Sequence, residues 1–554
     1  MKQYKLICLA FVLGCFSAFG QGSLLSKGKI SGNIQFDAQY YIPDSIIGAE
    51  EIENRIRANG YANINYVNGG FSAGIRYENY EWPLIDFEKI NYVGSGIPHY
   101  FAAYNHEYVE VVVGSFYEQF GSGLIYRSYE ARNLGYDNAT QGIKVKAKPY
   151  KGVDIIGVWG KQRNLFTAEG QVRGIDANVS FTEIFTKINE SDFRLSIGGS
   201  FVSKFEKDDD PDYKLPQNVG AAAGRLNFGY ANFDLQGEYA WKCNDPSAAN
   251  DMIYKHGEAL LLTASYSMRG LGVFLTALRT DNFDFRTKRN AVSNNNIINY
   301  IPTLTREHSY ALPSMYAYSS QPVEQIGFQA EINYKIPRRT KIGGRYGTDI
   351  LLNYSRIHEV KKQYVSDALL PDELIDMSGT DGYTSPFFTF GKLVFFEDFN
   401  IEISRRLHKS WKLILSYVYL NYNIEVIEGH TGDPNVHAHS VIADLTWKID
   451  NTNALRLELQ HMNTKQDKGN WVYAQLEYSI APRWFFSVLD RWNYGNPVKE
   501  KQVHYYNVAT SFVHKTSKFT LSFGKQYEGI LCVGGVCRVV PASYGCNLSV
   551  VTSF

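Results

Sequence analysis

Apolar and polar residues alternate along most of the chain. Between positions 30 and 40, Ile30, Ile34, Phe36 and Tyr40 take every second place, with small residues between them in the same set, and polar residues fill the other set. Runs of roughly 9 to 13 residues with this period of two recur, which indicates strands with one apolar face. A tilted strand that spans a bilayer needs about 9 to 11 residues, whereas strands of soluble sandwiches average about 5 to 6. The run lengths therefore favour membrane-spanning strands.

The connections between these runs alternate in length. Short turns are predicted at 67–70, 104–106, 149–151, 230–232, 268–271, 408–410, 450–453, 481–483 and 515–518. Long segments lie between them at 82–98, 118–140, 204–217, 284–323, 359–387, 424–436 and 531–543. Short periplasmic turns and long extracellular loops are typical of an outer-membrane barrel.

The predicted fold is all-β: one large antiparallel transmembrane barrel of about 24 strands, within a range of about 18 to 26. We see no regular blade repeat of the kind that propellers show, and no shift in composition marks a linker. Residues 21–554 are therefore predicted to form a single barrel domain. The alternative is a large soluble all-β protein with aromatic-rich sheets.

The two ends of the chain are predicted to carry a signal peptide and an assembly signal. Lys2 and Lys5 precede an apolar stretch too short to span as a helix, and small residues at 18–20 suit cleavage before Gln21, so residues 1–20 are predicted to be a signal peptide. At the other end, Leu548, Val550 and Phe554 lie in one register of the last predicted strand. This strand is predicted to close the barrel on residues 29–41. It also resembles the C-terminal signal that the barrel assembly machinery reads as an added strand.

Composition narrows the expected partners. Lys plus Arg and Asp plus Glu both number 56, so no basic excess suggests nucleic acid. Aromatic residues make up 15% of the chain, which suits strands and membrane interfaces. We expect contact with outer-membrane lipid, with the assembly machinery, and with a periplasmic or surface protein. We expect no cofactor, no metal site and no catalytic residues.

Two cysteines bracket a tight turn. Cys532 and Cys537 flank Val-Gly-Gly-Val, and an oxidising compartment could join them in a disulfide. The alternative is a loop with two unpaired thiols.

The segment 118–140 keeps neither the strand nor the helix period for long. It combines three glycines with charges of both signs: Glu118, Arg127, Glu130, Arg132 and Asp137. Such a loop is predicted to fold into the lumen, to pair with lining residues that carry charges of both signs, and so to narrow the lumen. The alternative is a surface loop that points outward. The predicted lining is itself mixed, at Glu331, Lys335, Arg456, Glu458, Glu477 and Arg491. A mixed lining argues against strong ion selectivity.

Three stretches carry a family resemblance: YEQFGSGL at 117–124, RSYEARNLGYDN at 127–138 and GGVCRVVPAS at 534–543. There the chain resembles a family of uncharacterised Bacteroidota outer-membrane barrels, a domain of unknown function. The resemblance implies a barrel in the outer membrane and no established activity. The leading expectation is a pore or transport channel. The alternatives are a plugged barrel that anchors a surface or periplasmic complex, and a barrel-embedded hydrolase.

Overall fold

A computed structural model describes residues 28–554 except 186, 188–191, 292, 366–376 and 534–535. The predicted signal peptide at 1–20 lies outside the described residues. In the described part, one sheet contains 24 strands. They are β1 (Lys29–Tyr41), β2 (Ile56–Asn68), β3 (Phe71–Trp82), β4 (Gly94–Asn105), β5 (Val109–Phe116), β8 (Thr140–Tyr150), β9 (Val153–Asn164), β10 (Thr167–Ser180), β11 (Phe193–Phe205), β12 (Asn218–Tyr230), β13 (Phe233–Lys242), β14 (Gly257–Met268), β15 (Leu271–Asp281), β16 (Glu324–Ile336), β17 (Thr348–Val360), β20 (Phe390–His408), β21 (Trp411–Tyr422), β22 (Val436–Lys448), β23 (Asn453–Asn463), β24 (Trp471–Ile480), β25 (Trp484–Trp492), β26 (His504–His514), β27 (Ser517–Gln526) and β30 (Ser543–Ser553).

Smaller elements lie in the connections. Three two-stranded ribbons pair β6 (Glu130–Ala131) with β7 (Tyr136–Asp137), β18 (Gln363–Tyr364) with β19 (Tyr383–Thr384), and β28 (Gly529–Val533) with β29 (Val536–Val540). The helices are α2 (Ile85–Glu88), α3 (Phe181–Ile184) and α5 (Ile424–Glu428), with short 3-10 turns η1 (Arg132–Leu134), η2 (Ala248–Asn250), η3 (Pro313–Tyr316) and η5 (Lys499–Lys501). No helix among the described residues is long and apolar enough to cross a membrane.

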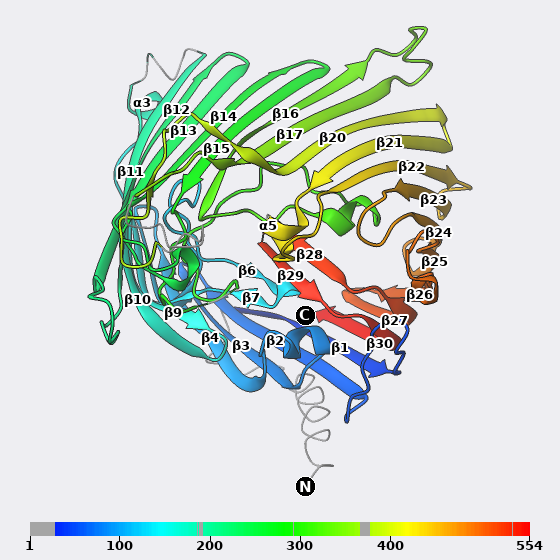
Figure 1. Cartoon of the computed structure of the whole chain (residues 1–554), viewed down its shortest axis with the longest axis horizontal. Coiled ribbons are helices and arrows are strands. Elements are labelled where there is room, and N and C mark those ends of the chain that lie inside the picture. The colour runs from blue at the N-terminus through cyan, green and yellow to red at the C-terminus, as the bar shows by residue number, and fades with distance from the viewer. Residues whose placement is uncertain (1–27, 186, 188–191, 292, 366–376, 534–535) are drawn as a thin grey trace.

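The sheet closes on itself through its first and last strands. β1 pairs antiparallel with β2 on one side and with β30 on the other, where Phe36 lies opposite Val550 and Tyr41 opposite Gly545. The remaining strands pair antiparallel with their neighbours along the chain, so the ring in Figure 1 has no free edge. The predicted closed antiparallel barrel of about 24 strands is confirmed.

The period of two separates the two faces of each barrel strand. On β13, the aromatic side chains of Phe233 and Trp241 are 37% and 41% exposed on the outer face, whereas Glu238 and Lys242 point inward and are buried. The two rings lie eight positions apart, or roughly 26 Å along the strand at about 3.3 Å per residue. This spacing matches two aromatic girdles that flank an apolar band about 25 Å tall.

The connections gather at two ends of the barrel. Every turn predicted to be short lies at one end, called the turn end, and the long segments lie at the other, called the loop end. Two turn-end connections are longer than this pattern predicts: 337–347, and the connection after β10. The latter begins with α3, whose first turn is capped by the Ser180 side chain, which accepts from the Glu183 N–H.

Two predicted loop boundaries are wrong: the loop predicted at 531–543 begins at residue 527, directly after β27. The loop predicted at 82–98 ends at residue 93, because β4 begins at Gly94 and pairs with β3. Two glycines, Gly94 and Gly96, remove side chains from the start of this strand and hide its alternation. A register shift in the pairing near Arg76 and Glu78 hides it further.

A hydrophobic core lies inside the ring. It joins inward-facing strand residues chiefly to two connections: residues 117–139, here called loop A, and residues 282–323, here called loop B. Smaller contributions come from the connections after β1, β21 and β27. Phe120 and Leu124 of loop A, and Phe285 and Leu304 of loop B, have no exposed surface. Figure 1 shows β6 and β7 of loop A within the ring of strands. Loop B is one of the long segments predicted at 284–323; its apolar side chains follow no regular period, and they are buried because the loop folds inward.

Candidate functional site: two loops inside the barrel

Loop A is tied to one wall by a buried ion cluster. The Asp137 carboxylate pairs with Arg76 of β3 at 2.8 Å and with Arg163 of β9, and it accepts a hydrogen bond from the Tyr117 hydroxyl at 2.9 Å. Arg163 also pairs with Glu78 at 2.7 Å. Buried charges persist only when they are paired and hydrogen-bonded in this way. Burial raises the pKa of the Asp137 carboxyl, but the coulombic pull of Arg163 and Arg76 outweighs it and holds that pKa below its ordinary value.

The other charged residues predicted for loop A also lie inside the barrel. Glu130 accepts from the Tyr61 hydroxyl at 3.0 Å and pairs with Arg132 at 3.0 Å. The Arg132 guanidinium stacks over the Tyr61 ring at 3.5 Å. Glu118 lies 3.3 Å from the Lys144 ammonium of β8. Charges of both signs therefore meet partners on the wall, although their effect on flow stays a prediction.

The tip of loop A docks on the strand β13. The Ser122 N–H donates to Glu238 Oε2 at 2.7 Å. Its neighbour Gly121 has a left-handed φ of +54°, and a methyl group there would lie 2.5 Å from Glu238 Oε2. Only glycine combines this conformation with so close an approach. No local pattern could have identified Glu238, because it lies 116 positions away in the chain.

Loop B reaches the opposite wall. The Thr305 hydroxyl donates to Asp398 of β20 at 2.8 Å, and His308 Nε2 lies 3.1 Å from the same carboxylate. Further along, the Leu312 N–H donates to Gln460 Oε1 of β23 at 2.9 Å. The start of loop B lies against β13, the strand on which the tip of loop A docks. There Lys242 donates to the Asp284 carbonyl at 2.5 Å.

The two loops are joined to each other by their backbones. The Arg127 N–H donates to the Ile298 carbonyl at 2.8 Å, and the Tyr300 N–H donates to the Gly123 carbonyl at 2.9 Å. The Arg127 guanidinium lies over the Tyr300 ring at 3.9 Å. Loops A and B thus form one body inside the barrel, held at β3 and β9 on one side and at β20 and β23 on the other.

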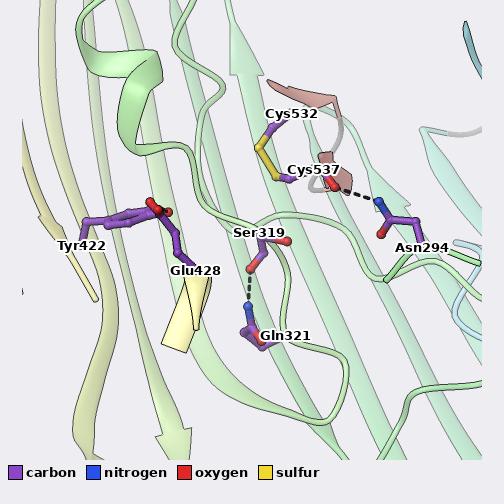
Figure 2. The surroundings of a disulfide bond; sticks show 7 residues. All are labelled: Asn294, Ser319, Gln321, Tyr422, Glu428, Cys532 and Cys537. Atoms are coloured by element: carbon purple, nitrogen blue, oxygen red, sulfur yellow. Dashed lines mark hydrogen bonds between the residues drawn. A yellow bond between two sulfur atoms is a disulfide. The ribbon is translucent and has the colours of Figure 1, made fainter. Parts of the chain in front are cut away.

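A disulfide-linked hairpin lies against loop B. Cys532 of β28 and Cys537 of β29 are joined in a disulfide, and Asn294 Nδ2 donates to the Cys537 carbonyl at 2.7 Å (Figure 2). Next to it, Arg538 pairs with Asp86 of α2 at 2.6 Å. The hairpin therefore connects loop B to the connection that follows β3.

The wall toward the turn end carries charges that reach solvent. Arg456 of β23 pairs with Asp444 at 2.9 Å and with Glu477 at 2.8 Å. Lys335 pairs with Asp349 at 3.0 Å, and both side chains are more than half exposed. Four predicted lining residues, Lys335, Arg456, Glu458 and Glu477, thus occur in pairs of opposite sign, whereas Glu331 accepts from Asn333 and Arg491 lies over the Tyr527 ring.

The last strand presents its apolar set outward. Leu548 and Phe554 are exposed on the outside of the barrel, and Val550 lies in the same register. The Phe554 N–H and carbonyl both bond to Gly32 of β1 at 3.0 Å. The reading of these residues as an assembly signal stays a prediction. Among the described residues, no group of three or more His, Cys, Asp or Glu side chains is placed to hold a metal ion.

Comparison with known proteins gives a family and a fold. A family model described as a family of unknown function (DUF6029) matches residues 1–554. No curated protein matches the chain. The siderophore receptor PirA from Pseudomonas aeruginosa is 9% identical, with 95% of this chain and 80% of that chain covered and a TM-score of 0.40.

Two further solved structures are similar at this level. OccAB4 from Acinetobacter baumannii is 10% identical over 84% of this chain and 98% of that chain, with a TM-score of 0.34. A mutant of the Rh. blastica porin is 11% identical over 65% of this chain and 100% of that chain, with a TM-score of 0.26.

Proposed function

Because the chain belongs to this family of unknown function, membership assigns it no activity, and we propose a role from the geometry: an outer-membrane channel for small solutes, narrowed by loops A and B. The observation that carries the proposal is the body formed by these two loops, joined to each other and tied to opposite walls. A folded body inside a barrel restricts what passes and leaves the wall intact.

The channel has a defined orientation in this proposal. The apolar outer band faces lipid, the loop end faces outward, and the turn end faces the periplasm. β1 starts at the turn end, where a chain exported through a cleaved signal peptide would enter the barrel. The assembly machinery would recognise β30, which closes the barrel on β1.

The turn-end half of the lumen supports passage rather than a solid seal. Exposed ion pairs, such as Lys335 with Asp349, keep this region wet, since charged side chains retain their hydration. The pairs combine opposite signs, so their fields largely cancel. The proposed channel is therefore weakly selective between anions and cations.

A second function rests on the apolar core of loops A and B. Fully buried side chains such as Phe120, Leu124 and Leu304 pack like those of a soluble domain, as a permanent seal would. A sealed barrel would serve as an anchor for a periplasmic or surface protein.

Solute uptake by proteoliposomes separates the two functions. Liposomes that contain the purified full chain should swell in isotonic solutions of small sugars and should swell progressively less as the sugar becomes larger. Protein-free liposomes provide the baseline. Swelling no faster than this baseline for every sugar would contradict the channel and favour the anchor.

A further inference from the structure

The loop end contains a cavity of about 760 Å³. Loop A, loop B, and the connections after β1, β3 and β27 all contribute to its wall, together with Leu165 of the turn after β9. Ligand sites in proteins typically have volumes of about 300 to 1,000 Å³. The cavity is therefore large enough for a small ligand and lies where the proposed channel would first meet solutes.

One side of this cavity is the open edge of a strand. β28 and β29 form a two-stranded sheet of their own, so the outer edge of β29 pairs with no other strand of the described residues. Asn294 donates to the Cys537 carbonyl from outside the hairpin (Figure 2), so the Cys537 backbone points away from β28. Backbone directions alternate along an antiparallel strand. The N–H and the carbonyl of Val539, two residues after Cys537, therefore point to the same open edge. Cys537 and Val539 both line the cavity.

The remaining lining combines apolar side chains with uncharged polar ones, such as Asn91 and Asn295, and its charges are balanced. Ile85, Ile90, Leu134, Pro541 and Ala542 form apolar parts of the wall. The charged lining residues are two acids, Glu50 and Glu528, and two bases, Lys89 and Arg538. Lys89 lies 3.5 Å from Glu50, and Arg538 is paired with Asp86, which lies behind the wall. A neutral ligand with apolar side groups suits such a surface better than an anion or a cation.

Strained backbone gathers at the same place. Asn91, Leu165 and Ser293 all line the cavity, and all three have left-handed φ values, of 56°, 55° and 53°. This conformation costs free energy for any residue other than glycine, and such residues cluster at ligand sites. The strain comes from three separate connections, so it is not the property of one turn.

We propose that this cavity captures short, neutral peptides in an extended conformation, which add a third strand to the edge of β29. An exposed strand edge is a template for backbone pairing, and alternate side chains of the added strand would enter the apolar wall. The ligand is a free peptide in solution outside the cell. This inference deepens the proposed channel function by naming a substrate class, and it rests on that function only for what happens after capture.

The test measures binding alone. A fluorescently labelled peptide, acetyl-Val-Ser-Val-Ser-Val-amide, is titrated with the detergent-solubilised full chain, and its anisotropy is followed. A fully N-methylated analogue of the same sequence cannot donate backbone hydrogen bonds. We expect this analogue to bind at least about tenfold more weakly, since the Val539 carbonyl of the edge receives no donor from it and its N-methyl groups prevent close approach to the strand.

Two variants locate the site. Val539→Pro removes an N–H from the outer edge and leaves the pairing of β29 with β28, so it should weaken binding about fivefold or more. The matched control Val539→Ala keeps that N–H and should bind within about twofold of wild type. Ala542→Trp fills the wall of the cavity and should also weaken binding. A shift in apparent size on boiling confirms that each variant is folded.

Three outcomes would overturn the proposal: equal binding of the N-methylated analogue, unchanged binding by both Val539→Pro and Ala542→Trp, or binding of the sequence only when it is embedded in a carrier protein. Because no current or uptake is measured, a failed channel assay leaves this result intact. Failure here likewise leaves the channel proposal standing without a substrate class.

Discussion

The Phe554 ring lies against the backbone of Gly32, at the seam where the last strand meets the first. A methyl group on Gly32 would come within 2.5 Å of this ring. The contact holds the final residue of the chain on the apolar outer face, next to the strand that completes the barrel.

Replacement of Phe554 by Asp should therefore impair assembly. A charge on the lipid-facing side of the seam is unfavourable, and the proposed assembly signal loses its last apolar residue. The amount of heat-modifiable protein in the outer-membrane fraction measures this. Ser553→Asp, one residue away on the opposite face, is the matched control. Wild-type amounts of folded Phe554→Asp would show that this residue is not part of a signal.

Removal of the charge on Asp137 should loosen loop A. The Asp137→Asn variant removes the carboxylate that joins loop A to Arg76 and Arg163 and leaves Glu78 as their remaining shared partner. The cost should therefore fall below the about 3 to 5 kcal/mol of a buried pair that is broken completely. Amide hydrogen exchange over 117–139 should become faster, with strands far from the cluster unchanged. Glu107→Gln, at an exposed turn, should change nothing. Equal protection of loop A in all three proteins would contradict the role of the ion cluster.

The docking of loop A should persist in mild acid. The pKa of Asp137 is lowered from 3.8 in the folded protein, so the unfolded state takes up the proton first as the pH falls. The stabilisation is complete well above the unfolded pKa and is lost as the pH falls through the lower folded pKa. Exchange of loop A should stay slow from pH 7 to about pH 5 and rise only below about pH 4. Asp137→Asn should lack this step; a step near pH 6 would point to another group.

Thiol counting tests the disulfide and the signal peptide together. The structure pairs Cys532 with Cys537 and leaves Cys243 and Cys546 as thiols. If the predicted cleavage after residue 20 removes Cys8 and Cys15, the unfolded mature chain should react with alkylating agent at Cys243 and Cys546 alone. Reduction should add Cys532 and Cys537. Labelling of all four without reduction would show that the hairpin is not bridged in the exported protein.

The strands of this barrel could be predicted from sequence because their signal is local. Each run of alternating residues, such as 30–40, indicates its own face without knowledge of its neighbours. The start of β4 was missed where Gly94 and Gly96 carry no side chain to show the alternation. Its bounds became clear only from its pairing with β3.

The positions of loops A and B are harder to predict from sequence, because the residues that they contact are distant in the chain. The charges and glycines of loop A suggested an inward fold, but Glu238 and Arg163 gave no sign of contacting it. Loop B has apolar residues without a lasting period, so its burial follows only from the space inside the ring. A sequence pattern indicates which residues are apolar and will be buried, whereas the closed barrel determines where they are buried.

Single-channel conductance in planar bilayers tests most directly whether loops A and B narrow the bore. Wild type is compared with a variant that lacks residues 118–140, and with a control that lacks 431–434, an exposed stretch outside both loops. Gly121→Ala adds a variant of full length, since its methyl group would collide with Glu238.

The account predicts a small, weakly ion-selective conductance for wild type and for the control. It predicts a clearly larger conductance for the 118–140 deletion, and more frequent openings for Gly121→Ala. An open wild-type channel whose conductance is unchanged by both variants would contradict the account.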